Sequence, residues 1–154
     1  MKQTKLKTFA VVSACMMGML SSSAQGVMQR TANYHPDGRG FSCVNGNNRY
    51  TRALYGSVDE WRLETSDRPI FAIFKKNNHR NIRFVIKCNG QAFQLDSVEY
   101  CKARYEAGKR EYLMKDKRWG SGVLKLSVLA YPQTEGAVWK FAAENFGKAK
   151  IEIV

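Results

Sequence analysis

The acidic residues are the first place to look for chemistry, because a glycosidase needs two carboxylates that converge on one bond. Only six acidic residues lie near other acidic residues in the sequence: Asp59, Glu60, Glu64, Asp67, Asp96 and Glu99. Their positions are typical of turns or of the exposed side of strands. We therefore interpret them as surface residues that promote solubility.

Histidine is the second place to look, and the chain has two, His35 and His79. A Ser-His-Asp or Cys-His site needs a histidine beside its nucleophile, and a metal site needs several ligands close together. His35 precedes Pro36 in a turn, and His79 follows Asn77 and Asn78 in a polar loop. The sequence thus predicts no catalytic residue, no metal site and no cofactor in this chain.

Residues that could bind carbohydrate are more numerous than residues that could catalyse a reaction. Aromatic rings stack on the C–H faces of sugars, and the candidates are Tyr50, Tyr55, Trp61, Trp119 and Trp139. Aromatic side chains also dominate protein cores, so we expect roughly two in three of them to be buried.

Four residues are our candidates for carbohydrate or domain contact: Arg49, Arg52, Trp61 and Trp119. Trp119 stands between Arg118 and Gly120 in a predicted loop, and we expect it to be the best exposed of the aromatic residues. The alternative for the two arginines is a structural ion pair with Glu60 or Glu64 across a hairpin.

The first 24 residues have the pattern of a signal peptide. Three lysines precede a mostly apolar run, and small residues at 22–24 offer a cleavage site. The apolar run is shorter than the about 20 residues that a membrane anchor needs. We predict cleavage near Ala24 and a periplasmic or secreted protein; a lipoprotein processed at Cys15 is the alternative.

Removal of residues 1–24, which hold three lysines and no acids, leaves 130 residues and lowers the formal net charge from +12 to +9. That length fits one domain, residues 25–154. Its basic residues are scattered and interleaved with acids, so we expect no nucleic-acid partner. Acidic polysaccharide or an anionic membrane surface is the more plausible partner of an exported basic protein.

Three cysteines follow the signal segment: Cys43, Cys88 and Cys101. Export permits a disulfide, but an odd number leaves at least one thiol unpaired. Their spacing fits neither a zinc knuckle nor a redox pair. We expect three small buried strand residues.

Short β-like runs separated by turn residues dominate from residue 40 onward. Residues 70–74 form a central strand in this interpretation, 82–88 form one strand, and Asn89-Gly90 is the clearest hairpin turn. Residues 99–111 could be taken for a helix, but Gly108 and the alternating tyrosines favour a hairpin. The sequence predicts an all-β protein, an antiparallel β-sandwich of about nine or ten short strands.

Several motifs resemble a specific family. They are Tyr34 to Gly38, Asn45-Gly46, Asn48 to Tyr50, residues 52–56 (Arg-Ala-Leu-Tyr-Gly), residues 81–83 and the strand at 124–131. This pattern resembles the N-terminal region of large exported bacterial proteins of an uncharacterised family, themselves similar to six-hairpin glycoside hydrolases.

The resemblance implies a non-catalytic N-terminal β-sandwich that precedes an (α/α) toroid, and the toroid would supply the catalytic acids. Since the sequence stops at Val154, we expect a fragment or truncated product whose partner is the missing C-terminal toroid. The alternative is a standalone periplasmic carbohydrate-binding module.

Overall fold

The computed structural model of the protein describes residues 33–47, 49–55 and 60–154. The predicted signal peptide lies outside these residues. Thirteen strands and two short 3-10 helices follow one another along the described residues. They are β1 (His35–Asp37), β2 (Gly40–Val44), β3 (Tyr50–Tyr55), β4 (Trp61–Ser66), β5 (Ile70–Lys75), β6 (Asn78–Arg83), β7 (Val85–Cys88), β8 (Gln91–Gln94), η1 (Leu95–Ser97), β9 (Tyr100–Glu106), β10 (Lys109–Lys115), η2 (Lys117–Trp119), β11 (Val123–Ala130), β12 (Ala137–Glu144) and β13 (Ile151–Ile153).

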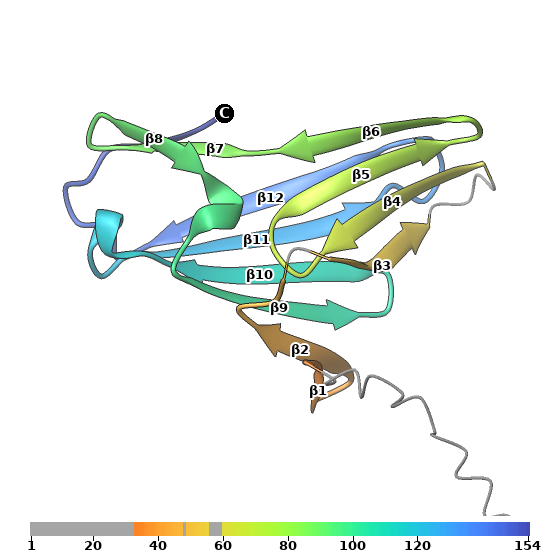
Figure 1. Ribbon diagram of the computed structural model, residues 1–154, viewed down its shortest axis with the longest axis horizontal. Helices are drawn as coiled ribbons and strands as arrows, with labels where there is room; N and C mark the ends of the chain where they lie inside the picture. Colours follow the sequence, from red (N-terminus) through yellow and green to blue (C-terminus); the bar gives the residue numbers. More distant parts are fainter. Residues whose placement is uncertain (1–32, 48, 56–59) are drawn as a thin grey trace, which may run out of the picture. The chain divides into compact units, whose positions relative to one another are not determined.

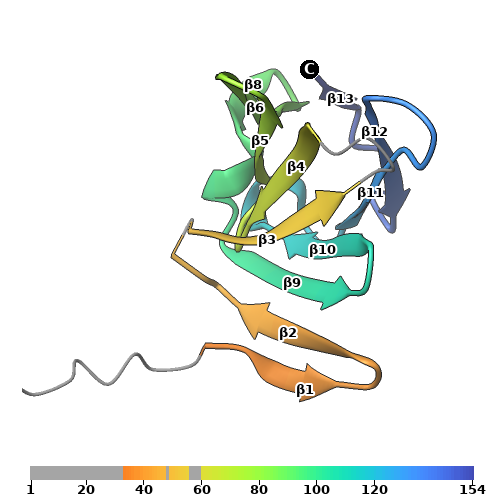
Figure 2. The ribbon, with the colours of Figure 1, turned by 90° about the vertical axis from the view of Figure 1, so that its right-hand side faces the viewer.

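The strands form three sheets in which every pairing is antiparallel. The largest has the order β1-β2-β9-β10-β11-β12, the second β3-β4-β5-β6 and the smallest β13-β7-β8. The four-stranded sheet lies over strands β9 to β12 of the six-stranded sheet (Figures 1 and 2). The predicted all-β antiparallel sandwich is confirmed, with thirteen strands where nine or ten were expected.

The additional strands come from segments that read as loops or as one continuous run. His35–Asp37, expected in a lead-in turn, pairs with β2 as a short edge strand. Residues 82–88, expected as one strand, are divided between β6 and β7, which belong to different sheets. The break falls at Phe84, whose carbonyl accepts a hydrogen bond from the backbone N–H of Leu95 at 2.8 Å. Apolar alternation continues across this break, so the alternation pattern does not indicate it.

The two predicted hairpins are present. Asn89 and Gly90 both have positive φ, +48° and +81°, as the tight turn between β7 and β8 requires. Residues 107–108 turn between β9 and β10, and Gly108 has φ of +76°. The stretch 99–111 is therefore a hairpin and not a helix, as predicted.

Strand alternation sends one set of side chains between the sheets. Phe71 of β5 lies at the centre of this core, with its ring edge-on to Tyr112 at 5.8 Å and to Trp139 at 5.9 Å between centroids. Such T-shaped contacts add about 0.5–1.5 kcal/mol each beyond the burial of area. The sheets are thus joined by aromatic packing from strands far apart in the sequence.

The three cysteines are all buried and unpaired, as expected. Burial raises the pKa of the Cys101 thiol to about 12 and also raises that of Cys43. A buried thiol with a raised pKa is a poor nucleophile. These cysteines pack in the core.

A charged side chain lies within the same core. Arg110 of β10 has no exposed surface, and its Nη2 donates to the hydroxyl of Tyr34 at 2.6 Å and to the carbonyl of Ser66 at 2.9 Å. The carboxylate of Asp67 lies 3.8 Å from Nη2. The rings of Tyr34 and Tyr112 are 5.5 and 5.4 Å from the guanidinium carbon.

The hydrogen-bond and ion-pair partners of Arg110 belong to two other parts of the chain. Tyr34 precedes β1, Ser66 ends β4, and Asp67 follows Ser66. Tyr112 donates its hydroxyl to the Ser66 carbonyl at 2.7 Å, and the Asp67 carboxylate accepts from Thr51 at 2.9 Å. This buried polar network ties the six-stranded sheet to one end of the four-stranded sheet. A short stretch of the described N-terminal segment is also held by it.

Replacing Asp67 with asparagine should destabilise the fold by about 3–5 kcal/mol, because a buried guanidinium loses its neutralising charge. Urea unfolding would measure the change. Glu135→Gln, which removes the exposed partner of Lys75, is the control and should cost less than about 1 kcal/mol. A loss for Asp67→Asn no larger than for the control would contradict the role given to the network.

Candidate functional site

The outward surface of the four-stranded sheet, here called the four-strand face, carries a row of rings and cations. The cross-strand register places Tyr55 beside Arg62, Arg62 beside Phe74, and Phe74 beside His79. One residue from each strand therefore contributes to a single line across the sheet. Neighbouring strands lie about 4.8 Å apart, so the line is about 14 Å long.

Contacts along this row hold it in place. The guanidinium carbon of Arg62 lies 4.0 Å from the centroid of the Phe74 ring. Phe74 and His79 stack at 5.4 Å with an interplanar angle of 18°. Tyr55, at the end of the row, is 67% exposed. The result is a row in which the Phe74 ring packs between Arg62 and His79, with one open tyrosine ring at the end of the row.

Small and polar residues form the next row. Ala53, Glu64, Ala72 and Asn81 are register partners across the same four strands. The small side chain of Ala53 lines a hollow of about 200 Å³ on this face. Glu64 and Tyr50 line the same hollow.

The polar groups around the hollow are oriented by their neighbours. The Glu64 carboxylate accepts from Arg62 Nε at 3.0 Å, and the Tyr50 hydroxyl lies 3.1 Å from the amide oxygen of Asn81. A carboxylate, an amide and a hydroxyl near an open tyrosine ring can bind a hydroxylated ring by stacking and hydrogen bonding.

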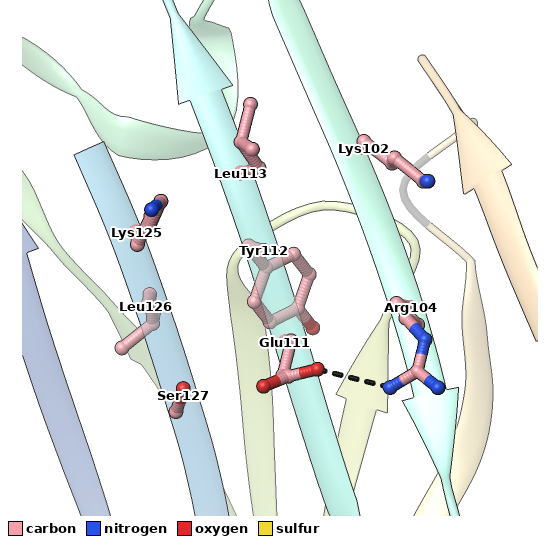
Figure 3. Close-up of a pocket in the computed structure, with 8 residues that line it drawn as sticks. All are labelled: Lys102, Arg104, Glu111, Tyr112, Leu113, Lys125, Leu126 and Ser127. Atoms are coloured by element: carbon pink, nitrogen blue, oxygen red, sulfur yellow. Dashed lines mark hydrogen bonds and ion pairs between the residues drawn. The ribbon is translucent and has the colours of Figure 1, made fainter. Parts of the chain in front are cut away.

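The opposite side of the sandwich has a second, more strongly charged surface. The six-strand face is the outward surface of the six-stranded sheet, and it contains a cavity of about 240 Å³ on β9, β10 and β11 (Figure 3). Its lining residues are Lys102, Arg104, Glu111, Tyr112, Leu113, Lys125, Leu126 and Ser127. Arg104 donates to Glu111 at 3.1 Å across the cavity floor.

Across the described ranges, no group of three or more His, Cys, Asp or Glu side chains is placed to hold a metal ion. In the same part of the chain, no helix has the length and apolarity to cross a membrane.

The structure corrects the expectation for Trp119. Its side chain is buried, with 3% of its surface exposed, and its indole N–H donates to the Gly122 carbonyl at 3.0 Å. Its ring stacks on Phe93 at 5.9 Å and packs on Phe146 at 5.7 Å. Basic and glycine neighbours suggested an open loop, but the short 3-10 turn η2 directs this ring inward.

Asp116 is the residue that shapes this turn. Its carboxylate accepts from the backbone N–H of Arg118 at 2.9 Å, from Arg118 Nε at 2.7 Å and from the backbone N–H of Glu99 at 3.0 Å. Burial alone would raise the pKa of Asp116, but the hydrogen bonds and the charge of Arg118 outweigh it and lower the pKa to about 2. The turn is thereby fixed, and Trp119 with it.

The other three candidates do not come together into one site. Trp61 is 4% exposed and points into the core, so its ring contacts neither a sugar nor a separate domain. Arg49 is exposed just before β3. Arg52 lines the hollow of the four-strand face, with its guanidinium 5.3 Å from the ring of Tyr34 and 5.4 Å from that of Tyr105.

The alternative interpretation of the arginines, an ion pair with Glu60 or Glu64, is also wrong. Among the residues that the structure describes, Glu60 pairs with Lys76 and Glu64 pairs with Arg62.

Phe74 and His79 were not among the predicted site residues. Phe74 ends a continuous apolar run, which gave no sign that one of its faces is open, and His79 was assigned to a loop. Tyr50 and Tyr55 had been recognised as aromatic candidates, and both are exposed, by 42% and 67%.

Residues 78–154, which are half of the chain, match the family model described as "Domain of unknown function (DUF4450)". The chain belongs to this family. The match spans β6 to β13 and so includes the cavity of the six-strand face, whereas three of the four strands of the four-strand face precede it. Neither the curated proteins nor the solved structures contain a significant match to the chain.

Trp119→Ala should cost about 3–5 kcal/mol of unfolding free energy, because it removes a buried ring with three packing or hydrogen-bonding partners. Chemical denaturation would measure this. Tyr131→Ala, which truncates an exposed ring, should change stability by about 0.5 kcal/mol at most. Equal effects of the two substitutions would show that Trp119 is not part of the core.

Asp116 should contribute to the pH dependence of folding. Its folded-state pKa of about 2 lies below its ordinary value of 3.8, so its contribution is complete above about pH 4 and is lost as the pH falls toward 2. The difference corresponds to roughly 2 kcal/mol. Unfolding free energies of the wild type and Asp116→Asn, measured from pH 6 to pH 2, should converge by that amount, and parallel curves would contradict the assignment.

Proposed function

We propose that this chain is a non-catalytic β-sandwich that holds glycan for an exported carbohydrate-processing protein, with the four-strand face as its binding surface. The observation that supports this most directly is the row Tyr55–Arg62–Phe74–His79 across four adjacent strands. Its length of about 14 Å suits several successive sugar rings better than a single one.

The chemistry of the face fits a neutral or weakly polar sugar. Tyr55 offers an open ring for stacking, and Glu64 and Asn81 offer acceptors and a donor for sugar hydroxyls. Arg62 donates to Glu64 and lies over Phe74, so the carboxylate is held in one position by a partner that is itself packed. Such preorganisation reduces the entropy lost when a ligand binds.

The resemblance to proteins that carry a catalytic toroid gives the larger setting of this proposal. In that setting the sandwich also supports a carbohydrate-processing domain supplied by another part of the protein. An exposed apolar patch is available for such a contact, since Leu129 and Val138 are paired neighbours that are 42% and 47% exposed, and Tyr131 follows at 44%. Export by a signal peptide at residues 1–24 belongs to the same proposal.

Tyr55→Ala should weaken glycan binding by about tenfold, since an aromatic stacking contact contributes on the order of 1 kcal/mol and more. Phe74→Ala should also weaken binding, because it removes the ring that packs between Arg62 and His79 and holds the row in place. Affinity electrophoresis through gels that contain soluble polysaccharides would identify a retained glycan, and calorimetry with its oligosaccharides would give the affinities.

Tyr131→Ala is the control, because it removes another exposed tyrosine ring that lies outside the row, and it should leave binding unchanged. Thermal unfolding of each variant would verify that it is folded. The proposal fails if the wild-type protein is retained by no polysaccharide, or if retention is insensitive to Tyr55→Ala and Phe74→Ala.

A further inference from the structure

The cavity of the six-strand face is built from two cross-strand rows. Leu113 of β10 is the register partner of Lys102 on β9 and of Lys125 on β11. The next row places Glu111 between Arg104 and Ser127. Figure 3 shows these side chains on three adjacent strands, with Leu113 and Glu111 on the middle one. An aliphatic surface is therefore flanked by an ammonium group on each side, about 10 Å apart at the backbone.

The charges around the cavity are only loosely neutralised. Lys102 pairs with Asp37 at 2.9 Å and Lys125 with Glu144 at 2.7 Å, and all four side chains are one third to one half exposed. Exposed pairs of this kind contribute little to stability, so a ligand carboxylate can replace Asp37 or Glu144 at small cost. Arg104, in contrast, is held by both Glu106 at 2.8 Å and Glu111 at 3.1 Å.

We infer that this cavity binds the carboxylate-bearing ring of an acidic saccharide, a hexuronate, with Lys102 and Lys125 as the carboxylate contacts. Leu113 provides an apolar surface for the C–H face of the sugar. Ser127 and Glu111 provide a hydroxyl and a carboxylate oxygen for ring hydroxyls. The site is separate from the four-strand face and does not depend on it.

The lining favours a saccharide over a nucleic acid. Single-stranded nucleic acids bind to basic grooves with aromatic platforms. The one aromatic residue of this lining, Tyr112, sends its ring into the core, where it packs on Phe71 and its hydroxyl donates to Ser66. Glu111 on the cavity floor would repel closely spaced phosphates but can accept hydrogen bonds from sugar hydroxyls.

The full chain should be tested by calorimetry against oligomers of galacturonate, glucuronate-containing disaccharide repeats, and mannuronate and guluronate, each beside its carboxyl-reduced counterpart. We expect at least one carboxylated oligomer to bind and its reduced counterpart to bind about tenfold more weakly or not at all. The double variant Lys102→Met and Lys125→Met keeps the aliphatic stems and should reduce binding of that oligomer by about tenfold or more.

Lys87→Met with Lys148→Met is the control, because it removes the same charge from exposed positions outside the cavity. It should leave binding unchanged. Asp37→Asn and Glu144→Gln should strengthen binding, since each removes a carboxylate that competes for the lysines. Tyr55→Ala should not affect binding at this cavity. The proposal for the cavity and the proposal for the four-strand face can therefore fail independently.

Three results would overturn the inference. One is the absence of any difference between carboxylated and reduced oligomers. Another is equal loss of binding in the cavity variant and the charge-matched control, which would indicate nonspecific electrostatics. The third is tighter binding of single-stranded oligonucleotides than of every uronate oligomer, which would assign the surface to nucleic acid.

Discussion

The burial of one guanidinium constrains the rest of this structure. Arg110 lies on the inward face of β10, where an apolar residue would be expected, and it is neutralised by Asp67 at the end of β4. A charge without exposed surface is tolerated only when its partners are held in place, so β4, β10 and the segment at Tyr34 must keep their relative positions. Among the residues that the structure describes, the Nε and Nη1 atoms of Arg110 have no hydrogen-bond partner, so the contacts of Nη2 to Tyr34 and Ser66 are its hydrogen bonds within that part of the chain.

Fixing the two sheets against each other leaves two outer surfaces with different chemistry. On the four-strand face, Arg62 is neutralised by Glu64 and covered by Phe74, and the surface is aromatic and hydrogen-bonding. On the six-strand face, charges predominate, and ion pairs link neighbouring strands around an aliphatic centre at Leu113. A single core thus supports one outer surface with an aromatic row and another with paired charges, and these are the two surfaces that we propose bind saccharides.

Local patterns in the sequence predicted the architecture well. Strands and tight turns depend on residues that are only a few positions apart, such as alternating apolar residues and the pair Asn89-Gly90. The all-β class and both hairpins could therefore be anticipated. Trp119 could not be placed in this way, because its burial depends on Asp116 folding the η2 turn and on two residues distant in the sequence, Phe93 of β8 and Phe146 after β12.

Both proposed surfaces are products of long-range strand pairing. Tyr55 and His79 become members of one row only through the order β3-β4-β5-β6, and Lys102 and Lys125 flank Leu113 only because β9, β10 and β11 are neighbours. Alternation predicts which residues share a face of one strand. It carries no information on which residues of other strands lie beside them.

We propose that the four-strand face is where this protein binds glycan. The most direct test is amide chemical-shift mapping of the isotope-labelled full chain, titrated with oligosaccharides from whichever polysaccharide retains the protein. We expect the largest shifts on β3, β4, β5 and β6, around Tyr55, Arg62, Phe74 and His79. Shifts confined to other strands, with these four residues unchanged at saturation, would contradict it.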